Sequence, residues 1–413
     1  MFRKYFISII LLSSALFPAC TNKVDDSLRQ GIELYNQNEL ESALPYLESA
    51  AEKFEANSET FAYLAETYRR LGMREDAMEA AQKALTIDSC NSFAHVTLSY
   101  LYNPMYGEWE MADREKAWEE LMKGIDCNPD DGNLWLAIWT EAIFRGDYMM
   151  ESKSLKMMIE SGFLTKSILA YNRWMLRHLP PNSVLITNGD MDTYPAVALQ
   201  ETEGFRNDVT IINYSLLNTR WYQKHIEERY KLEFPLSKKE LDDLKPFKDT
   251  NDQIKTNASQ ILSAIIKVKS ENRFESPLAI SLTVGDFGFA QGFEDHFVLM
   301  GAFKLWRDDI EGPNFDLDAI KSSLEAINID DFTGPFVSAE DRSPVRTVYT
   351  KKISLNFTNL ATFVIEEYIK QNNINEAMSM LQWANRANTA ITKDPETTEK
   401  LDQLNTELAN ARS

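Results

Sequence analysis

The sequence contains few residues of the types on which thiol, metal and acid–base chemistry depend. Its 413 residues include three cysteines and four histidines, and none of them occurs in a CxxC motif or a zinc-type spacing. The patterns GxSxG and GxGxxG and the P-loop are missing as well. A binding protein is therefore favoured over an enzyme, no cofactor is expected, and a metal site is left open.

Basic residues are also in short supply. Lysine and arginine number 43 against 63 aspartates and glutamates, which gives a formal net charge of −20. Proteins that bind nucleic acid need a basic face to displace counterions from the phosphates. No cluster of Lys and Arg supplies one here, so the sequence predicts no nucleic-acid partner.

No apolar run is long enough to span a bilayer, which takes about 20 residues. The N-terminal run from Phe6 to Phe17 is shorter and follows two basic residues, as in a signal peptide. It ends at Ala19-Cys20, which resembles the lipobox of bacterial lipoproteins. The resemblance implies that residues 1–19 are removed, that Cys20 carries a lipid anchor and that 20–27 is a tether. An ordinary secretory signal with an incidental cysteine is the alternative.

The next segment repeats itself with a period of 34 residues, so that Gly31 aligns with Ala65. Small residues at matching positions allow two antiparallel helices to approach closely, and Asn38 and Gly72 suit the turns between them. The pattern resembles the tetratricopeptide repeat. The other matching positions are Ala43, Leu47 and Ala50 in the first copy and Ala77, Ala81 and Ala84 in the second.

Two further copies extend the repeats, which are expected over residues 28–178. The third copy runs from Ser92 to Asp130 with an insertion around Pro104, and the fourth begins near Gly132. Such a stack buries a continuous core, to which its tryptophans are expected to belong. Because stacks of this kind usually hold a peptide or another protein, the repeats predict a protein partner.

Cys90 and Cys127 lie near the ends of second helices in neighbouring repeats. An exported protein can form a disulfide, and loops at such ends can come close. We favour two separate, buried thiols, since neither cysteine belongs to a pairing motif.

The periodicity changes near Leu179, where two prolines end the helical pattern. Short apolar runs suited to buried strands then alternate with helical segments. The alternation predicts an α/β domain over 179–355 with a mainly parallel sheet, followed by a C-terminal helical hairpin and tail over 356–413. The expected fold class is thus α+α/β, with an all-α repeat solenoid first. Strands are expected at 183–187, 209–213, 278–284 and 297–305. Helices are expected at 195–203, at 218–230 with Asn218 as its cap, and at 251–269.

A polar loop, Asn188 to Thr193, follows the first of these strands. In parallel sheets, sites form beyond the carboxyl ends of the strands, where this loop lies. Asp190 and Asp192 are two residues apart and suit a hard cation or sugar hydroxyls. Asp, Asn and Gly are also the ordinary residues of loops and caps, so a structural role is the alternative. The candidate binding residues of the loop are Asn188, Gly189, Asp190, Asp192 and Thr193.

Three segments carry a family resemblance: Pro181–Pro195 with its Asn-Gly-Asp-Met-Asp-Thr-Tyr-Pro loop, Leu199–Val209, and Ser215–Tyr222 with its Leu-Leu-Asn-Thr-Arg-Trp-Tyr turn. They are similar to the soluble C-terminal region of a bacterial membrane-protein family related to protein O-mannosyltransferases. The transferase chemistry of that family is expected in a membrane-spanning half that has no counterpart here, so the resemblance implies no activity. It favours one binding site in which Asn218, Trp221 and Tyr222 join the loop. The alternative is a structural turn that locks two strand–helix connections, with Trp221 and Tyr222 in the core.

The sequence therefore predicts a cell-envelope lipoprotein, anchored to the outer membrane, that acts as a binding or scaffold protein. Its repeats would hold a protein partner, and its α/β domain would recognise a glycan or glycosylation machinery. The periplasmic face and the cell surface are both open. The alternative function is an enzyme in which Asp190 and Asp192 bind a metal or act as acid and base on a sugar or phosphoester.

Overall fold

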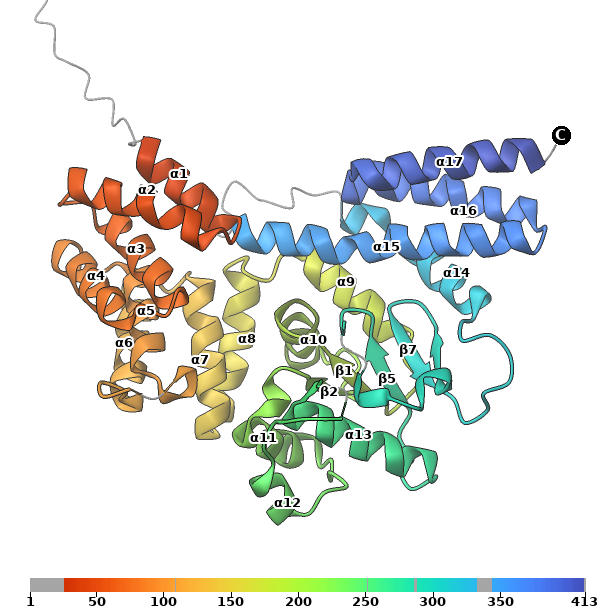
Figure 1. Ribbon diagram of the computed structural model, residues 1–413, viewed down its shortest axis with the longest axis horizontal. Helices are drawn as coiled ribbons and strands as arrows, with labels where there is room; N and C mark the ends of the chain where they lie inside the picture. The colour runs from red at the N-terminus through yellow and green to blue at the C-terminus, as the bar shows by residue number, and fades with distance from the viewer. Residues whose placement is uncertain (1–25, 108, 251, 286–287, 333–343, 412–413) are drawn as a thin grey trace, which may run out of the picture. The chain divides into compact units, whose positions relative to one another are not determined.

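The computed structural model describes residues 26–107, 109–250, 252–285, 288–332 and 344–411 (Figure 1). The predicted signal peptide and Cys20 lie outside the described residues. The described chain is mostly helical and divides into two compact units, one ending at Ile87 and the other beginning at Asp88. Among the described helices, none is both long and apolar enough to cross a bilayer. The predicted order of helical hairpins, sheet and C-terminal helices is confirmed.

The first unit consists of two helical hairpins, as the 34-residue period predicted. An added Cβ at Gly31 would lie 2.7 Å from Leu47 Cδ2, so the first hairpin needs a glycine where its helices approach. Asn38 and Gly72 turn the chain with φ angles of 67° and 82°. The helices are α1 (Asp26–Asn36), α2 (Leu40–Lys53), α3 (Ser58–Arg70) and α4 (Arg74–Ile87).

Two more hairpins begin the second unit. Trp135 and Trp139 are 2% and 1% exposed, which confirms that they belong to the core. The insertion in the third hairpin is held by the buried carboxylate of Glu141, which accepts hydrogen bonds of 3.2 Å from both Asn103 and Arg114. The elements are α5 (Ser92–Tyr102), η1 (Pro104–Tyr106), α6 (Arg114–Cys127), α7 (Gly132–Arg145) and α8 (Tyr148–Glu160).

Cys90 and Cys127 form a disulfide, so the interpretation as two separate, buried thiols is wrong. Their Cα atoms are 5.1 Å apart, with Cys90 just before α5 and Cys127 at the end of α6. Cys90 is exposed and Cys127 is half-buried. An antiparallel hairpin places the start of its first helix beside the end of its second, which is why two cysteines so far apart in the sequence meet.

The sheet has the strand order β2-β1-β5-β7-β6. β1 runs parallel to β2 and β5, whereas β7 opposes both β5 and β6, so β7 alone runs against the others and the mainly parallel sheet is confirmed. The single strand expected at 297–305 is wrong, because the chain reverses at Gly301 with a φ of 128°. The strands are β1 (Val184–Thr187), β2 (Thr210–Asn213), β5 (Leu278–Ser281), β6 (Phe297–Leu299) and β7 (Phe303–Trp306).

Helices cover both faces of the sheet (Figure 1). Alternate residues of a strand face opposite sides, so Leu185 packs toward α10 and the C-terminal helices while Val184 and Ile186 pack toward α11 and α13.

The helix expected at 251–269 begins only at Asn257, because Thr256 caps it and the short hairpin β3–β4 precedes it. The other elements of this region are α9 (Lys166–Arg177), α10 (Asp190–Glu203), η2 (Leu216–Asn218), α11 (Arg220–Tyr230), α12 (Lys238–Asp243), β3 (Phe247–Lys248), β4 (Ile254–Lys255), α13 (Asn257–Ser270), η3 (Gly288–Ala290), η4 (Glu294–His296), α14 (Leu317–Glu325) and η5 (Ile329–Asp331).

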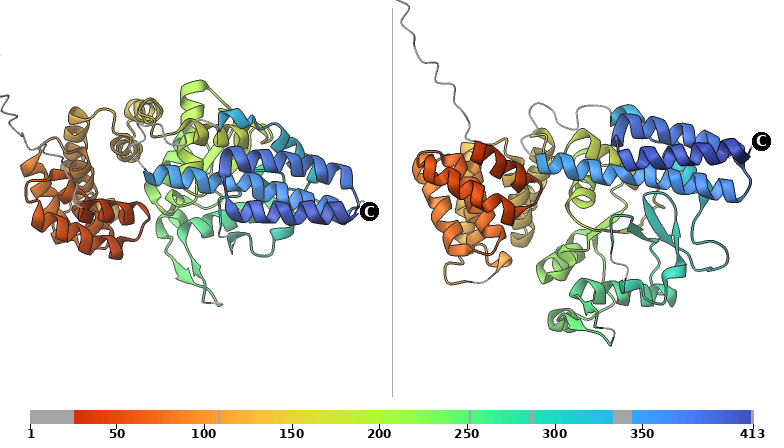
Figure 2. Two further views of the ribbon diagram at one scale, coloured as in Figure 1. Left: turned by 90° about the horizontal axis from the view of Figure 1, so that it is seen from above. Right: turned by 45° about the horizontal axis from the view of Figure 1, so that its top comes forward.

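The C-terminal helices pack side by side, each against the other two (Figure 2). The predicted hairpin is formed by the long helix α15 and by α16. The predicted tail forms a helix whose Leu401, Leu404 and Leu408 are buried in the core. The elements are α15 (Pro344–Lys370), α16 (Ile374–Ala387), the π-helical turn η6 (Asn388–Thr392) and α17 (Pro395–Ala411).

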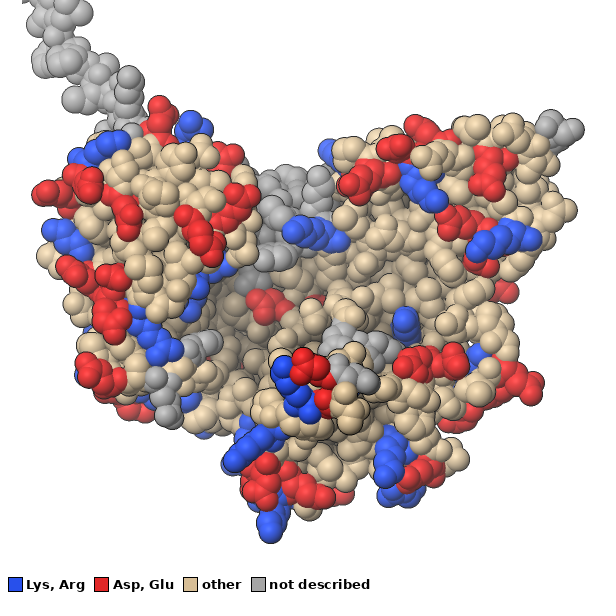
Figure 3. Space-filling model, viewed as in Figure 1, with Lys and Arg blue, Asp and Glu red and all other residues tan. Residues whose placement is uncertain are grey.

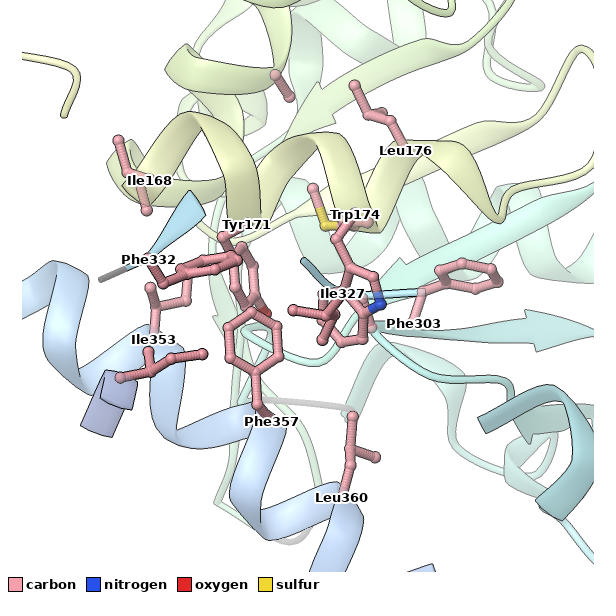
Figure 4. Packing of buried hydrophobic residues seen from close by; sticks show 14 of the residues in the cluster. Ile168, Tyr171, Trp174, Leu176, Phe303, Ile327, Phe332, Ile353, Phe357 and Leu360 are labelled. Atoms are coloured by element: carbon pink, nitrogen blue, oxygen red, sulfur yellow. The ribbon is translucent and has the colours of Figure 1, made fainter. Parts of the chain in front are cut away.

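Helix α9 is buried between the sheet layer and α15 (Figure 4). Tyr171, Trp174 and Phe357 form an aromatic cluster with ring centroids 4.8 to 5.5 Å apart. Both polar tips on α9 are satisfied: the Trp174 indole donates to the Ser323 carbonyl of α14 at 2.8 Å, and the Tyr171 hydroxyl accepts from Asn356 at 3.0 Å. α9 is therefore joined to α14 and α15 by packing and by directed hydrogen bonds.

Helix α10 begins at Asp190, although the sequence analysis expected its start at Pro195. Pro195 has no N–H, so the carbonyl of Met191, four residues earlier, loses its helical partner. The buried side chain of Asn172 on α9 replaces it, because its Nδ2 donates to the Met191 carbonyl at 2.8 Å. A side chain from another helix thus allows a proline inside α10.

Substitution of Asn172 tests whether its side-chain amide replaces the hydrogen bond that Pro195 cannot make. Asn172→Ala should destabilise the second unit by about 1–3 kcal/mol, because the part-buried Met191 carbonyl loses the hydrogen bond that Asn172 donates. In a Pro195→Ala background the loss should be smaller by about 1 kcal/mol, since the new N–H can bond to Met191 within the helix. All eight tryptophans lie in the second unit, so urea unfolding followed by their fluorescence measures this unit. Strictly additive losses in the two backgrounds would contradict the assignment.

Candidate functional site

The candidate loop after β1 forms, from Asp190 on, the first turn of α10. Asp192 is only 1% exposed. Its Oδ2 accepts from the backbone N–H of Asn188 at 2.8 Å, and its Oδ1 accepts from that of Gly189 at 3.0 Å. The hydroxyl of Thr283, just beyond β5, also donates to Oδ2. Both carboxylate oxygens are thus used inside the protein, where they close the N-terminus of α10 against the sheet.

The environment of Asp192 also changes its acidity. Burial raises the pKa of this carboxyl above its ordinary value, while hydrogen bonds from Thr283 and from the Gly189 backbone favour the charged form and oppose the shift. Its hydrogen-bonding capacity is directed at the protein, which favours an architectural role over metal binding.

Thr193 connects the carboxyl ends of two strands. Its hydroxyl lies 2.6 Å from the hydroxyl of Thr187 and accepts from Asn213 Nδ2 at 3.0 Å. The Tyr222 hydroxyl in turn accepts from the backbone N–H of Asn213 at 3.0 Å. Thr187 and Asn213 were not among the residues predicted from the sequence. Each is a polar residue at the end of an apolar strand, and that position was the available sign.

Two predicted site residues contact other elements. Asn218 was expected to cap α11, but its Oδ1 accepts from the backbone N–H of Ala258 at 2.9 Å and so caps α13. Trp221 is half-buried, with its ring centroid 6.4 Å from that of Phe144 on α7. The structure therefore brings Asp192, Thr193 and Tyr222 to the buried strand ends and turns Asn218 and Trp221 toward neighbouring helices.

Asn188 and Asp190 are the exposed members of the candidate set, and Gly189 is half-buried. The Ser215 hydroxyl donates to the Asn188 carbonyl at 2.9 Å, which links the loop after β1 to the loop after β2. Within the residues that the structure describes, no group of three or more His, Cys, Asp or Glu could hold a metal ion. A binding role for this edge of the sheet therefore stays a prediction that rests on Asn188 and Asp190.

Arg206, from the second of the three motifs, has a structural task. Its guanidinium donates to the carbonyls of Leu176, Leu179 and Pro180 at 2.6, 2.9 and 3.0 Å. Arg206 also pairs with Asp208 and lowers the pKa of that carboxyl to about 2. The pair closes the end of α9 and fixes the entry of the chain into β1.

A buried charged cluster joins α8 to α10 and α11. Glu151 Oε1 lies 2.9 Å from Arg229 Nη1 and 3.9 Å from His225 Nε2, and Arg229 also pairs with Glu201 at 2.8 Å. Burial raises the pKa of Glu151 to about 7, with Arg229 opposing and Glu201 adding to the shift. Burial, reinforced by the charge of Arg229, lowers the pKa of His225 to about 4.

The two aspartates of the candidate loop should differ in their effect on stability. Asp192→Ala should destabilise the second unit by about 1–3 kcal/mol, because two backbone N–H groups and a hydroxyl lose their acceptor. Asp190→Ala, the matched change at an exposed position, should cost about 0.5 kcal/mol or less. Urea unfolding followed by tryptophan fluorescence measures both, and equal losses would refute the architectural role of Asp192.

The Glu151 cluster predicts a pH dependence. Because the pKa of Glu151 is raised from 4.5 to about 7, the folded protein holds an extra proton between these values and the stabilising contribution of Glu151 falls as pH rises through them. Glu151→Gln cannot lose this proton, so its melting temperature relative to the wild type should rise between pH 5 and pH 8. The opposite slope from His225 is present in both proteins. A difference in melting temperature that is independent of pH would argue against the shift.

Comparison with known proteins places these residues in context. A family model, the TMEM260-associated domain 2, matches residues 169–395, which include most of α9, the sheet and the candidate residues of the α/β domain. The chain is similar to the structure of TTC0263, a thermophilic TPR protein in Thermus thermophilus, with 22% identity, a TM-score of 0.32 and coverage of 43% of this chain and 90% of that one. It is also similar to a tetratricopeptide repeat protein from Parabacteroides merdae, with 11% identity, a TM-score of 0.29 and coverage of 92% and 97%. No curated protein matches the chain.

Proposed function

This chain belongs to the family of the TMEM260-associated domain 2, and from that premise we propose that it is a protein-binding scaffold of the cell envelope. Its helical hairpins are of the tetratricopeptide type, a fold that presents helix faces to partner proteins. The candidate residues that the sequence suggested for chemistry are largely occupied by contacts within the protein, as Asp192 illustrates. Binding is therefore the function that the geometry supports best.

The observation that carries the proposal is a face shared by α1 and α3 in the first unit. The half-buried rings of Tyr35 and Tyr63 meet edge to face with centroids 5.3 Å apart, and the exposed Arg70 lies over Tyr35 at 5.3 Å. Arg69 is held beside them by two hydrogen bonds of 2.7 Å to Glu66. Tyrosine and arginine are the residues most enriched at the energetic centres of protein interfaces.

Photo-crosslinking in cells tests this surface. A photoreactive phenylalanine analogue in place of Tyr63 should trap one partner, whereas the same analogue at the exposed Tyr46 on α2 should not. The partner is then purified, and its dissociation constant for the full chain should increase about tenfold with Arg70→Ala, as expected for an interface arginine. Equal trapping at both positions, or an unchanged dissociation constant, would contradict the proposal.

We further propose that the scaffold is lipid-anchored through Cys20, on the outer membrane. The support is the basic segment, the short apolar run and the Ala19-Cys20 junction in the sequence. Cells fed a clickable fatty acid should label the wild-type protein. The variant Cys20→Ser should remain unlabelled, and label on that variant would exclude this anchor.

The partner class that we propose for the α/β domain is a glycan or the glycosylation machinery. Its support is the resemblance of the three motifs between Pro181 and Tyr222, together with the exposure of Asn188 and Asp190 at the edge of the sheet. A glycan array probed with the wild type and with Asp190→Ala measures glycan binding and its dependence on Asp190. Binding that the substitution leaves unchanged would remove Asp190 from the proposed surface.

A further inference from the structure

A cleft of about 760 Å³ opens between the β6–β7 hairpin, α14 and the turn between α15 and α16. It lies apart from the carboxyl ends of β1 and β2, and none of the candidate residues from the sequence lines it. Its volume is within the range of about 300–1,000 Å³ that is typical of ligand sites.

The floor of the cleft is apolar. Val298 and Leu305 are cross-strand partners in β6 and β7, and their side chains share the face of the sheet that the cleft covers. Phe315 and Leu317, both partly buried, continue this floor toward α14. The ring of Phe315 is fixed edge to face against Phe363 of α15, with centroids 5.2 Å apart. A bulky aliphatic side chain of a ligand would find a preformed surface here.

One polar group opens onto the cleft from a buried position. Tyr368 on α15 is 5% exposed and lines the cleft. Across the described part of the chain, neither its hydroxyl nor the carboxylate of Asp318 on α14 has a hydrogen-bond or ion-pair partner. Burial raises the pKa of Tyr368, and the next largest cause is the charge of Asp318, which places the two groups within electrostatic reach of each other. The Tyr368 hydroxyl is therefore a hydrogen-bonding group in the wall of the cleft that a ligand can use.

The charge of the cleft favours a cation. Asp316, Asp318 and Glu376 line it together with Lys321 and Arg307. Lys321 is already neutralised, because its Nζ lies 3.3 Å from Glu376 and 3.2 Å from a second glutamate on α14. Acidic side chains also gather over the neighbouring C-terminal helices, with few basic ones between them (Figure 3). The three carboxylates of the lining outnumber its two basic groups, so the cleft favours a cationic ligand over an anionic one.

We propose that this cleft binds a linear peptide segment in which a lysine or arginine is flanked by bulky aliphatic residues. The aliphatic side chains lie on Val298 and Leu305. The cation is held between the Asp318 carboxylate and the Tyr368 hydroxyl, where an N–H donor completes both acceptors. The apolar floor and the acidic rim are then explained by one occupant.

Isothermal titration of the full chain in detergent with three capped peptides tests the proposal. The peptide acetyl-Ala-Leu-Lys-Leu-Ala-amide should bind. The peptides with Gln in place of Lys, or with Ala in place of both Leu, should each bind about tenfold more weakly. Hydrogen exchange should show that the Lys peptide protects β6–β7 and the α15–α16 turn.

Substitutions in the cleft distinguish binding at this site from nonspecific electrostatic attraction of the peptide to the acidic protein. Tyr368→Phe and Asp318→Asn should each weaken the Lys peptide by about fivefold or more, as expected for hydrogen bonds to a charged group. Both keep the shape of the side chain, and neither group has a partner to lose among the described residues, so melting temperatures should stay unchanged. Asp402→Asn on α17, the matched control outside the cleft, should bind as the wild type does. No binding of the Lys peptide, equal binding of the Gln peptide, or equal effects of Asp318→Asn and Asp402→Asn would overturn the proposal.

Discussion

The burial of α9 on both of its sides is the contact on which the second unit depends. On one side, Tyr171 and Trp174 pack against Phe357 of the long C-terminal helix, and the Trp174 indole is tied to α14. On the other side, Asn172 donates to the first turn of α10 at Met191. The positions of the sheet edge and of the walls of the cleft therefore follow from one helix. A helix that is buried on most of its circumference gains most of its stability from such packing.

Backbone groups left without local partners are completed by side chains from other elements. Pro195 removes a helical hydrogen bond, and Asn172 restores it. The start of α13 is completed by Asn218, and the start of α10 is closed by Asp192 from within its own first turn. Arg206 does the same for the carbonyls at the end of α9. Because an unpaired buried group costs more than a hydrogen bond contributes, these few residues fix how the layers are joined.

The structural role of these side chains also explains how the sequence motifs relate to function. Several residues that the motifs single out, among them Asp192, Thr193 and Asn218, connect elements of the fold through their polar atoms. The surfaces that remain for partners are of other kinds: an aromatic and arginine face on α1 and α3, and an apolar cleft with an acidic rim beside β6 and β7. Both suit the recognition of proteins or peptides better than they suit catalysis on a small substrate.

The sequence by itself determined the features that depend on near neighbours along the chain. Small residues 34 positions apart predicted the hairpins, Asn38 and Gly72 predicted their turns, and apolar runs predicted β1 and β2. The physical basis of these predictions is local. A few consecutive residues decide whether two helices can approach closely, whether the backbone can turn left-handed and whether a strand can be buried.

Only the tertiary structure decided the rest, because each of these features requires a partner distant in sequence. Pro195 reads as a helix start until Asn172 accounts for the missing hydrogen bond, and Asn218 reads as the cap of α11 until α13 is beside it. Cys90 meets Cys127 only once an antiparallel hairpin has formed. Asp192 resembles a ligand-binding carboxylate in the sequence and becomes a structural one when the fold supplies two backbone donors and a hydroxyl.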